Sequence, residues 1–197
     1  ALMIPCLIIL IILMAGAVWQ IGDIVVEYIA ERRKHKCNVP QLLRDVHAAG
    51  ADGLAELIEN SGLLRRQKKA LLELAESRGL PKDTLTALAE RLLATEEARN
   101  ARTTSITDMI AKLGPMFGLL GTLIPLGPGI VALGQGDTVT LSESMNVAFD
   151  TTIAGVISAA VASVISHIRK RWYNDDMVSL ETLMEAVLEE VTSDVEG

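Results

Sequence analysis

Three long apolar runs constrain the fold of this chain more than any other feature. They cover residues 1–19, 109–134 and 145–168. A helix of about 20 apolar residues spans the hydrocarbon core of a bilayer. Such a helix also pairs its own backbone polar groups, which an open strand in lipid does not do. The sequence therefore predicts an all-α integral membrane protein with three transmembrane helices.

The first apolar run continues as an amphipathic extension. Gln20, Asp23 and Glu27 are interspersed with apolar residues, so we expect the helix to leave the membrane there. A signal peptide is the alternative, but no basic residue precedes the run, and a basic start is typical of signal peptides. Whether native residues precede Ala1 is also left open. We predict that residues 1–30 form the first transmembrane helix and its extension.

Residues 31–108 are predicted to form a helical region outside the membrane. Pro40 and Pro81 each open a helix, and residues 60–62 separate the first helix from the next. Leucine recurs at helical spacing through this region, and no strand pattern is present. Nothing breaks the last of these helices before Gly114. We therefore expect it to continue into the second apolar run, because proline and glycine are the main helix breakers.

A polar loop and a C-terminal helix complete the predicted order of elements. The loop covers residues 135–144, between the second span at 109–134 and the third span at 145–168. Basic and aromatic residues at 169–173 are expected to end the third span. An amphipathic helix is then predicted within residues 169–197.

The distribution of basic residues predicts the orientation. All 18 Lys and Arg lie at positions 32–112 or 169–171. Loops rich in Lys and Arg stay in the cytoplasm. The N-terminus and the 135–144 loop are therefore expected outside, and the large helical region and the C-terminus are expected in the cytoplasm.

Small residues line one face of the second and third spans. Gly114, Gly118 and Gly121 recur on the second span, and Gly155 and Ala159 recur on the third. Small residues at this spacing let transmembrane helices approach closely. Because a single three-helix unit cannot bury both stripes completely, we predict a homo-oligomer in the lipid bilayer. A glycine-rich membrane helix without a special role is the alternative.

Two prolines are expected to kink the second span. Pro125 and Pro128 lie in its later half beside Gly127 and Gly129. A proline removes one helical hydrogen bond and clashes with the preceding turn. Neighbouring helices must then satisfy the freed carbonyl groups.

Four polar residues within the spans are candidates for lining an ion path. Thr122 lies on the glycine face of the second span, and Asp150, Thr151 and Thr152 lie near the outer end of the third span. One interpretation is that each hydroxyl bonds back to its own helix. The other is that the hydroxyls face a polar centre. Asp150 is either an ion ligand or a carboxyl near the interface, since a charge in the bilayer is costly.

Several classes of function are disfavoured by the composition and motifs. The net charge of −7 argues against a nucleic-acid partner, which calls for a basic surface. The sequence contains no glycine-rich phosphate loop, nucleophile elbow or metal-ligand motif. We therefore expect neither an enzyme nor a bound metal or cofactor.

Two segments resemble the MotA/TolQ/ExbB family of ion-driven motor subunits. Residues 114–122, GPMFGLLGT, resemble the glycine-rich signature of that family, and residues 148–155, AFDTTIAG, resemble its "ALxxTxxGL" segment. Three spans with a large cytoplasmic loop resemble the TolQ/ExbB branch. The sequence departs from the better-known branches at Asp150, Pro125 and Pro128.

The resemblance implies a function and a set of partners. The family's two pore-side threonines correspond to Thr122 and Thr152. Five copies are expected to surround a single-span partner like ExbD, TolR or MotB, whose intramembrane aspartate carries a proton or a sodium ion. The complex would convert ion flow into mechanical work in the plasma or inner membrane of a prokaryote. A scaffolding membrane protein that moves no ions is the alternative, and an autonomous channel is the third.

Overall fold

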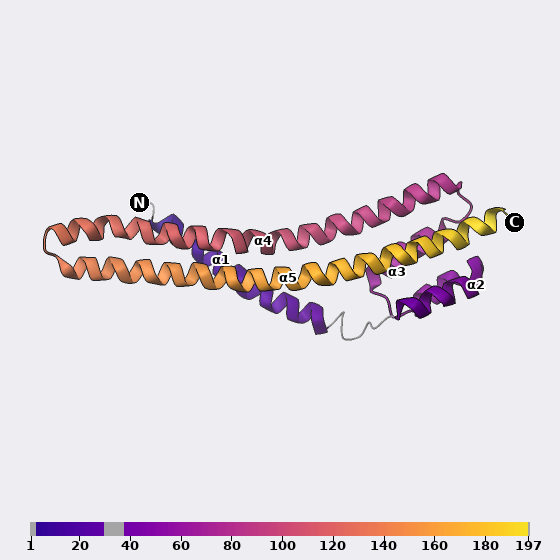
Figure 1. Cartoon of the computed structure of the whole chain (residues 1–197), viewed down its shortest axis with the longest axis horizontal. Helices are drawn as coiled ribbons and strands as arrows, with labels where there is room; N and C mark the ends of the chain where they lie inside the picture. Colours follow the sequence, from indigo (N-terminus) through magenta and orange to yellow (C-terminus); the bar gives the residue numbers. More distant parts are fainter. Residues whose placement is uncertain (1–2, 30–37, 197) are drawn as a thin grey trace. The chain divides into compact units, whose positions relative to one another are not determined.

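The computed structural model describes residues 3–29 and 38–196, and it contains five helices (Figure 1). They are α1 (Met3–Glu27), α2 (Val39–Asn60), α3 (Arg65–Glu76), α4 (Lys82–Gly134) and α5 (Thr138–Glu196). No strand occurs among these described residues, which confirms the predicted all-α fold. The basic cluster at 31–36 and the thiol of Cys37 lie outside the described residues.

Three of the helices are long and apolar enough to cross a membrane. They are α1, α4 and α5, and they contain the three predicted spans. The chain is therefore a multi-pass membrane protein, as the apolar runs predicted.

The helix α4 is continuous across the predicted start of the second span. It begins directly after Pro81 and continues through Thr107 and Asp108 to Gly134. The absence of a breaking residue before Gly114 predicted this continuity. Pro115, Pro125 and Pro128 all lie inside the helix, so the glycine and proline residues of the second span do not end it.

The helix α5 is longer than predicted at both ends. It begins at Thr138, so the connection between the two helices is residues 135–137, while the limits of the loop predicted at 135–144 relative to the membrane stay a prediction. The carboxylate of Asp137 accepts hydrogen bonds from the backbone N of Thr140 at 3.0 Å and from its Oγ1 at 2.6 Å, which stabilises the first turn. The helix also continues through residues 169–173, because no glycine or proline occurs between Gly155 and Gly197.

The helix α2 contains an interruption that the sequence analysis missed. Gly50 has φ 61° and ψ −178° inside the helical range Val39–Asn60. This positive φ is open to glycine and strained for residues with a Cβ atom. Gly50 therefore separates two helical segments that the leucine spacing had indicated as one.

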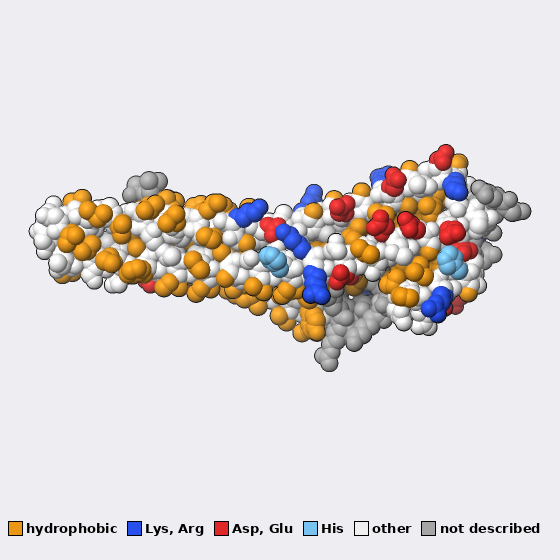
Figure 2. Space-filling view, in the orientation of Figure 1, with side chains coloured by type: hydrophobic (Ala, Val, Ile, Leu, Met, Phe, Trp, Pro, Cys, Tyr) orange, Lys and Arg blue, Asp and Glu red, His pale blue; other side chains and the backbone are white. Residues whose placement is uncertain are grey.

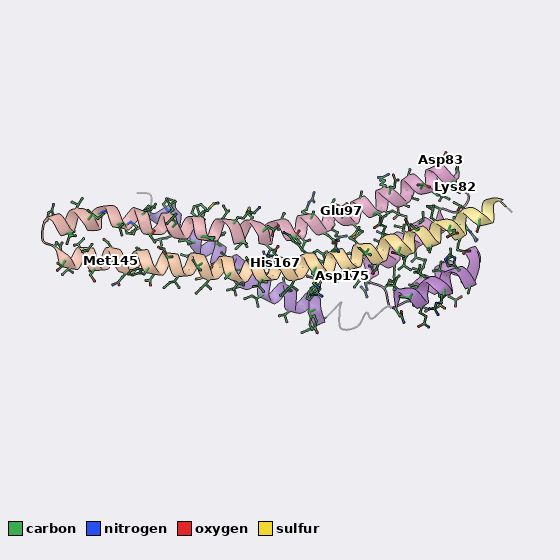
Figure 3. The ribbon with its side chains drawn as sticks, in the orientation of Figure 1. Lys82, Asp83, Glu97, Met145, His167 and Asp175 are labelled. Atoms are coloured by element: carbon green, nitrogen blue, oxygen red, sulfur yellow. The ribbon has the colours of Figure 1, made fainter. Side chains whose placement is uncertain are left out.

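The chain divides into two compact units. The membrane unit comprises the described parts of residues 1–25 and 103–170, and the second unit comprises those of residues 26–102 and 171–197. Both α4 and α5 contribute to each unit. Lys82, Asp83, Glu97 and Asp175 in Figure 3 are charged residues of the second unit.

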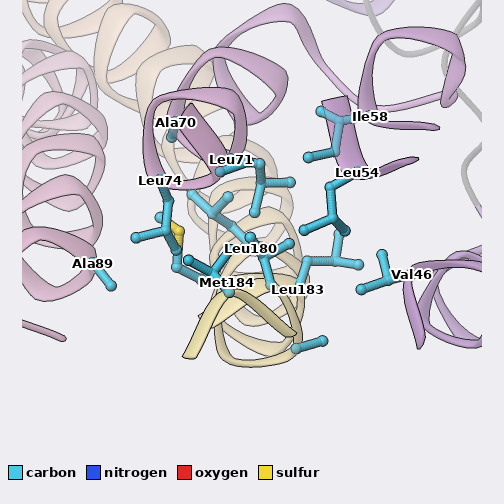
Figure 4. Packing of buried hydrophobic residues seen from close by; sticks show 14 of the residues in the cluster. Val46, Leu54, Ile58, Ala70, Leu71, Leu74, Ala89, Leu180, Leu183 and Met184 are labelled. Atoms are coloured by element: carbon cyan, nitrogen blue, oxygen red, sulfur yellow. The ribbon is translucent and has the colours of Figure 1, made fainter. Parts of the chain in front are cut away.

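The second unit has one apolar core built from four helices. Leu180, Leu183 and Met184 of α5 lie among side chains of α2 and α3 (Figure 4), and all three are about 1% exposed. The core also includes Leu85 and Ala89 from the start of α4. The helical region therefore packs on the C-terminal helix.

The membrane unit contains α1, the second half of α4 and the first half of α5. The α4 and α5 segments lie side by side and antiparallel (Figure 1). A small apolar cluster of Leu13, Ala17, Ile110 and Ala162 joins all three helices. The polar residues discussed below are all in this unit.

Candidate functional site

Glycine residues bring the backbones of α4 and α5 into contact. A Cβ atom placed on Gly114 would lie 2.7 Å from the carbonyl oxygen of Gly155 and 3.0 Å from the Cβ of Ala159. A Cβ atom on Gly155 would lie 2.6 Å from the carbonyl oxygen of Gly114 and 2.8 Å from the Cα of Gly118. Neither position has room for a side chain, because the obstructing atoms belong mainly to the facing backbone.

The same contact continues along α4 to Gly121. A Cβ atom on Gly121 would lie 2.7 Å from the Cβ of Thr151. Thr151 is 5% exposed, and its hydroxyl donates to the carbonyl oxygens of Val147 at 3.0 Å and Ala148 at 2.9 Å. Thr151 therefore fills the helix contact rather than an open face.

Thr122 and Thr152 lie at the edge of the helix contact and are half-buried. The hydroxyl of Thr122 donates to the carbonyl oxygen of Leu119 at 2.7 Å, and the hydroxyl of Thr152 donates to that of Ala148 at 3.0 Å. The back-bonded interpretation of both threonines therefore fits this single chain. The two hydroxyls lie at similar depth, because the preceding residues Gly121 and Thr151 touch each other.

Both threonines lie on the flank of the α4–α5 pair that is away from α1. Phe117 marks the α1 side of α4, because its carbonyl oxygen accepts from the Sγ of Cys6 at 3.5 Å. At about 100° per residue, Thr122 lies about 140° around α4 from Phe117. Thr152 lies about 100° around α5 from Arg169, which bonds to α1. We call this flank the threonine face.

Asp150 lies elsewhere on α5. Its side chain is exposed, and it makes no hydrogen bond or ion pair with any residue that the structure describes. The helix is regular through Thr151, so Asp150 lies about 200° around it from Thr152. The structure therefore does not bring Asp150 onto the threonine face.

The prolines of α4 leave carbonyl groups without their usual helical donors. A proline at position i lacks the N–H that would bond to residue i−4. Pro125 and Pro128 thereby free the carbonyl groups of Gly121 and Ile124. The helix continues through both prolines, and the predicted kink stays a prediction.

A buried polar cluster joins all three helices near one end of the membrane unit. Arg169 of α5 is 2% exposed and donates to Asp23 of α1 at 2.6 Å. It also donates to Gln20 at 3.5 Å, and Gln20 accepts from the hydroxyl of Thr107 on α4 at 2.6 Å. The cluster closes the α1 flank with satisfied polar groups, as buried polar atoms require.

A second polar group lies on the opposite flank of the same end. The carboxylate of Asp108 accepts from Lys170 Nζ at 2.6 Å and from the hydroxyl of Ser166. The side chains of Asp108 and Lys170 are 30% and 54% exposed.

Neither group was predicted from the sequence. Asp108, Arg169 and Lys170 were expected only as residues beside the spans, and the bases as markers of orientation and of the end of the third span. The signal in the sequence is a carboxylate beside each of the first two apolar runs, Asp23 and Asp108, and two adjacent bases, Arg169 and Lys170, directly after the third.

The surface of the membrane unit is mostly apolar. Figure 2 shows hydrophobic and uncharged side chains along its visible face. Exposed residues on α4 and α5 include Leu119, Leu123, Ile130, Ile153 and Ile157, each more than half exposed. An apolar surface of this extent suits lipid or other membrane helices.

Comparison with known families points to the same part of the chain. A family model described as the MotA/TolQ/ExbB proton channel family matches residues 56–182, more than half of the chain. The match includes the glycine contact, the threonine face and the Asp108 group. No curated protein matches the chain.

Proposed function

Because this chain belongs to the MotA/TolQ/ExbB proton channel family, we propose that it is a ring-forming subunit of a proton-driven motor complex. Its three spanning helices fit the TolQ/ExbB-like branch of the family. Five copies would surround a single-span partner like ExbD, TolR or MotB, and ion flow would move the partner relative to the ring. Membership of the family supports an ion-driven function in general. The ring and the single-span partner are what we propose in addition.

The observation that carries the proposal is the threonine face. Thr122 and Thr152 lie at similar depth on two helices whose glycine contact fixes their separation. Both are half-buried within one chain, on the flank that α1 leaves open. A pair of hydroxyls held this way can line a narrow polar lumen, where they can exchange their helical bonds for bonds to water.

The proposal assigns the ion-carrying carboxylate to the partner. Between Leu113 and Ile168 the ionisable side chains, apart from His167, are those of Asp137, Glu143 and Asp150. The first two belong to the outer end of the unit, and Asp150 lies away from the threonine face. A ring whose threonine face carries hydroxyls but no carboxylate needs a carboxylate from another chain.

Oligomerisation would cover surface that one chain leaves exposed. The apolar residues of α4 and α5 include several that are more than half exposed, and the exposed carboxylate of Asp150 lies among them. A neighbouring subunit or the partner would remove Asp150 from lipid, where a charge is unfavourable. Five copies is the number that the resemblance implies.

We also propose the orientation and the location. The end with Arg169 and Lys170 would face the cytoplasm, because basic residues are retained there. The connection at residues 135–137 would then lie outside, in the plasma or inner membrane of a prokaryote.

Replacement of the two threonines by valine tests the proposal. The complex is reconstituted with its partner in liposomes, and proton uptake is followed with an entrapped pH-sensitive dye. We expect Thr122→Val and Thr152→Val to lower gradient-driven proton flux while the ring still assembles. Thr95→Val is the matched control, because the hydroxyl of Thr95 also bonds back to its helix, at 2.7 Å from the carbonyl oxygen of Arg91, but in the second unit. Absence of flux in the wild-type complex would favour a scaffold without ion conduction, and normal flux in both membrane variants would exclude the two threonines from the ion path.

A further inference from the structure

The Asp108 group occupies the inner end of the threonine face. We propose that Asp108, held by Lys170 and Ser166, is the site at which the proton leaves the membrane unit for the cytoplasm. This inference rests on the proposed function and adds a proton-release residue to it. Three observations carry it: the contacts of Asp108, its position relative to the threonines, and its contrast with the second ion pair nearby.

The contacts give Asp108 a fixed position and access to water. Lys170 Nζ lies 2.6 Å from its Oδ2, and Ser166 donates to its Oδ1. The carboxylate and the ammonium group are both partly exposed. A carboxylate that is held by two donors and still reaches water can accept and release a proton.

Helix geometry places the group on the threonine face. Lys170 follows Thr152 by 18 residues, which is five turns, so the two side chains point in the same direction about 27 Å apart. Asp108 precedes Thr122 by 14 residues, which leaves it about 40° away around α4 and about 21 Å along the helix axis. A proton that moves along this face past both threonines therefore arrives at Asp108.

The other ion pair at this end has a different environment. Arg169 is 2% exposed, and it pairs with Asp23, whose side chain is 57% exposed, on the flank covered by α1 beside Gln20 and Thr107. Its role is to hold the three helices together. Two carboxylate–base pairs thus lie at the same level, one with a buried base on the α1 flank and one with a half-exposed base on the threonine face.

The charges around Asp108 suit a release site. Lys170 and Lys112 are the bases on its side, Lys112 being one turn further along α4, and both favour its ionised form. The proton leaves the partner's carboxyl group, passes through water to a carboxylate oxygen of Asp108, and continues to cytoplasmic water. One O–H bond breaks and another forms at each step, and no electron is transferred.

The experiment measures proton flux at different pH values on the cytoplasmic side. The full chain and its single-span partner are reconstituted in liposomes that contain a pH-sensitive dye, and a potassium diffusion potential drives the flux. We expect Asp108→Asn to lower the flux about tenfold. This loss is smaller than the usual rate contribution of a positioned proton-transfer group, because water partly substitutes for the carboxylate. The same variant should flatten the dependence of the flux on cytoplasmic pH. Asp108→Glu should restore most of the flux.

The matched control is Asp23→Asn, which removes the carboxylate of the pair on the α1 flank. This variant should melt at a lower temperature and keep the wild-type pH dependence of flux. A second variant, Lys170→Met, covers the case in which Asp108→Asn does not assemble. It keeps Asp108 without its base, so the cytoplasmic pH at which the flux is half-maximal should rise.

The outcomes separate this inference from the proposed function. If wild-type complexes conduct no protons, the proposed function fails. The inference alone is overturned if wild type conducts and Asp108→Asn keeps the wild-type pH dependence. It is also overturned if Asp23→Asn flattens that dependence equally, or if Lys170→Met leaves the half-maximal pH unchanged.

Discussion

Substitution of Gly155 by alanine tests whether the backbone contact between α4 and α5 holds the membrane unit together. The new Cβ atom would lie 2.6 Å from the carbonyl oxygen of Gly114, and 2.8 Å and 3.1 Å from the Cα and N of Gly118. Ordinary contacts begin near 3.4 Å, so the shortest contact is too close by about 0.8 Å. All three obstructing atoms are backbone, and therefore the helices must separate.

The expected cost follows from two opposing effects. Overpacking at a tight contact costs about 1–3 kcal/mol. Alanine regains up to about 1 kcal/mol of helix propensity relative to glycine. We expect a net loss of about 1–2 kcal/mol, which corresponds to a melting temperature about 2–8 °C lower for a chain of this size.

Thermal unfolding of the purified protein in detergent measures the effect, and two other glycines of the same helix pair serve as controls. A Cβ atom on Gly118 would meet its nearest neighbour at 3.4 Å, and a Cβ atom on Gly127 would meet nothing within 4 Å. Gly118→Ala should therefore be close to neutral. Gly127→Ala should leave stability unchanged or raise it slightly, because only the propensity term remains.

The melting temperatures of the three variants should fall in a fixed order. Gly155→Ala should be the least stable and Gly127→Ala the most stable. If Gly155→Ala melts at or above the temperature of Gly127→Ala, the close approach of α4 and α5 at Gly155 is refuted.

Three further predictions concern the loop, the second unit and the exposed carboxylate. The hydrogen bonds from Thr140 lower the pKa of Asp137 from its ordinary value, so its contribution to stability is present above that ordinary value and disappears as the pH falls through the lowered pKa. The difference in melting temperature between wild type and Asp137→Ala should then vanish in acid, and a difference that is constant with pH would contradict this. Excised residues 38–108 should not unfold cooperatively by circular dichroism, because the core residues Leu180, Leu183 and Met184 come from α5; a sharp transition would show an independent core. Asp150→Asn should shift the dependence of flux on external pH and leave assembly intact. Thr152→Val should lose more flux than Asp150→Asn. A larger loss of flux in Asp150→Asn would assign the ion path to Asp150.

The sequence by itself determined the class of fold and the number of spans. Three apolar runs of sufficient length leave helices as the available structure in lipid. The continuity of α4 was also predictable, because no glycine or proline lies between Pro81 and Gly114. The same rule, applied to residues 156–196, would have predicted the continuous α5. The basic and aromatic residues at 169–173, which are expected to end the third span, lie inside this helix, because a change of environment does not break the backbone.

Tertiary structure decided which residues of each helix meet. The spacing of Gly114, Gly118 and Gly155 indicated a packing face, but the register that places Gly114 on Gly155 depends on two helices at once. The separation of Asp150 from Thr152 also became definite only when α5 proved regular through Thr151.

The polar groups of the membrane unit show the same limit. Asp23 and Arg169 are 146 residues apart in sequence, and Asp108 and Lys170 are 62 apart. Periodicity reports the face of one helix and carries no information on the rotation of its neighbour. Which carboxylate pairs with which base is therefore a property of the packed helices. One pair lies on the α1 flank and the other on the threonine face.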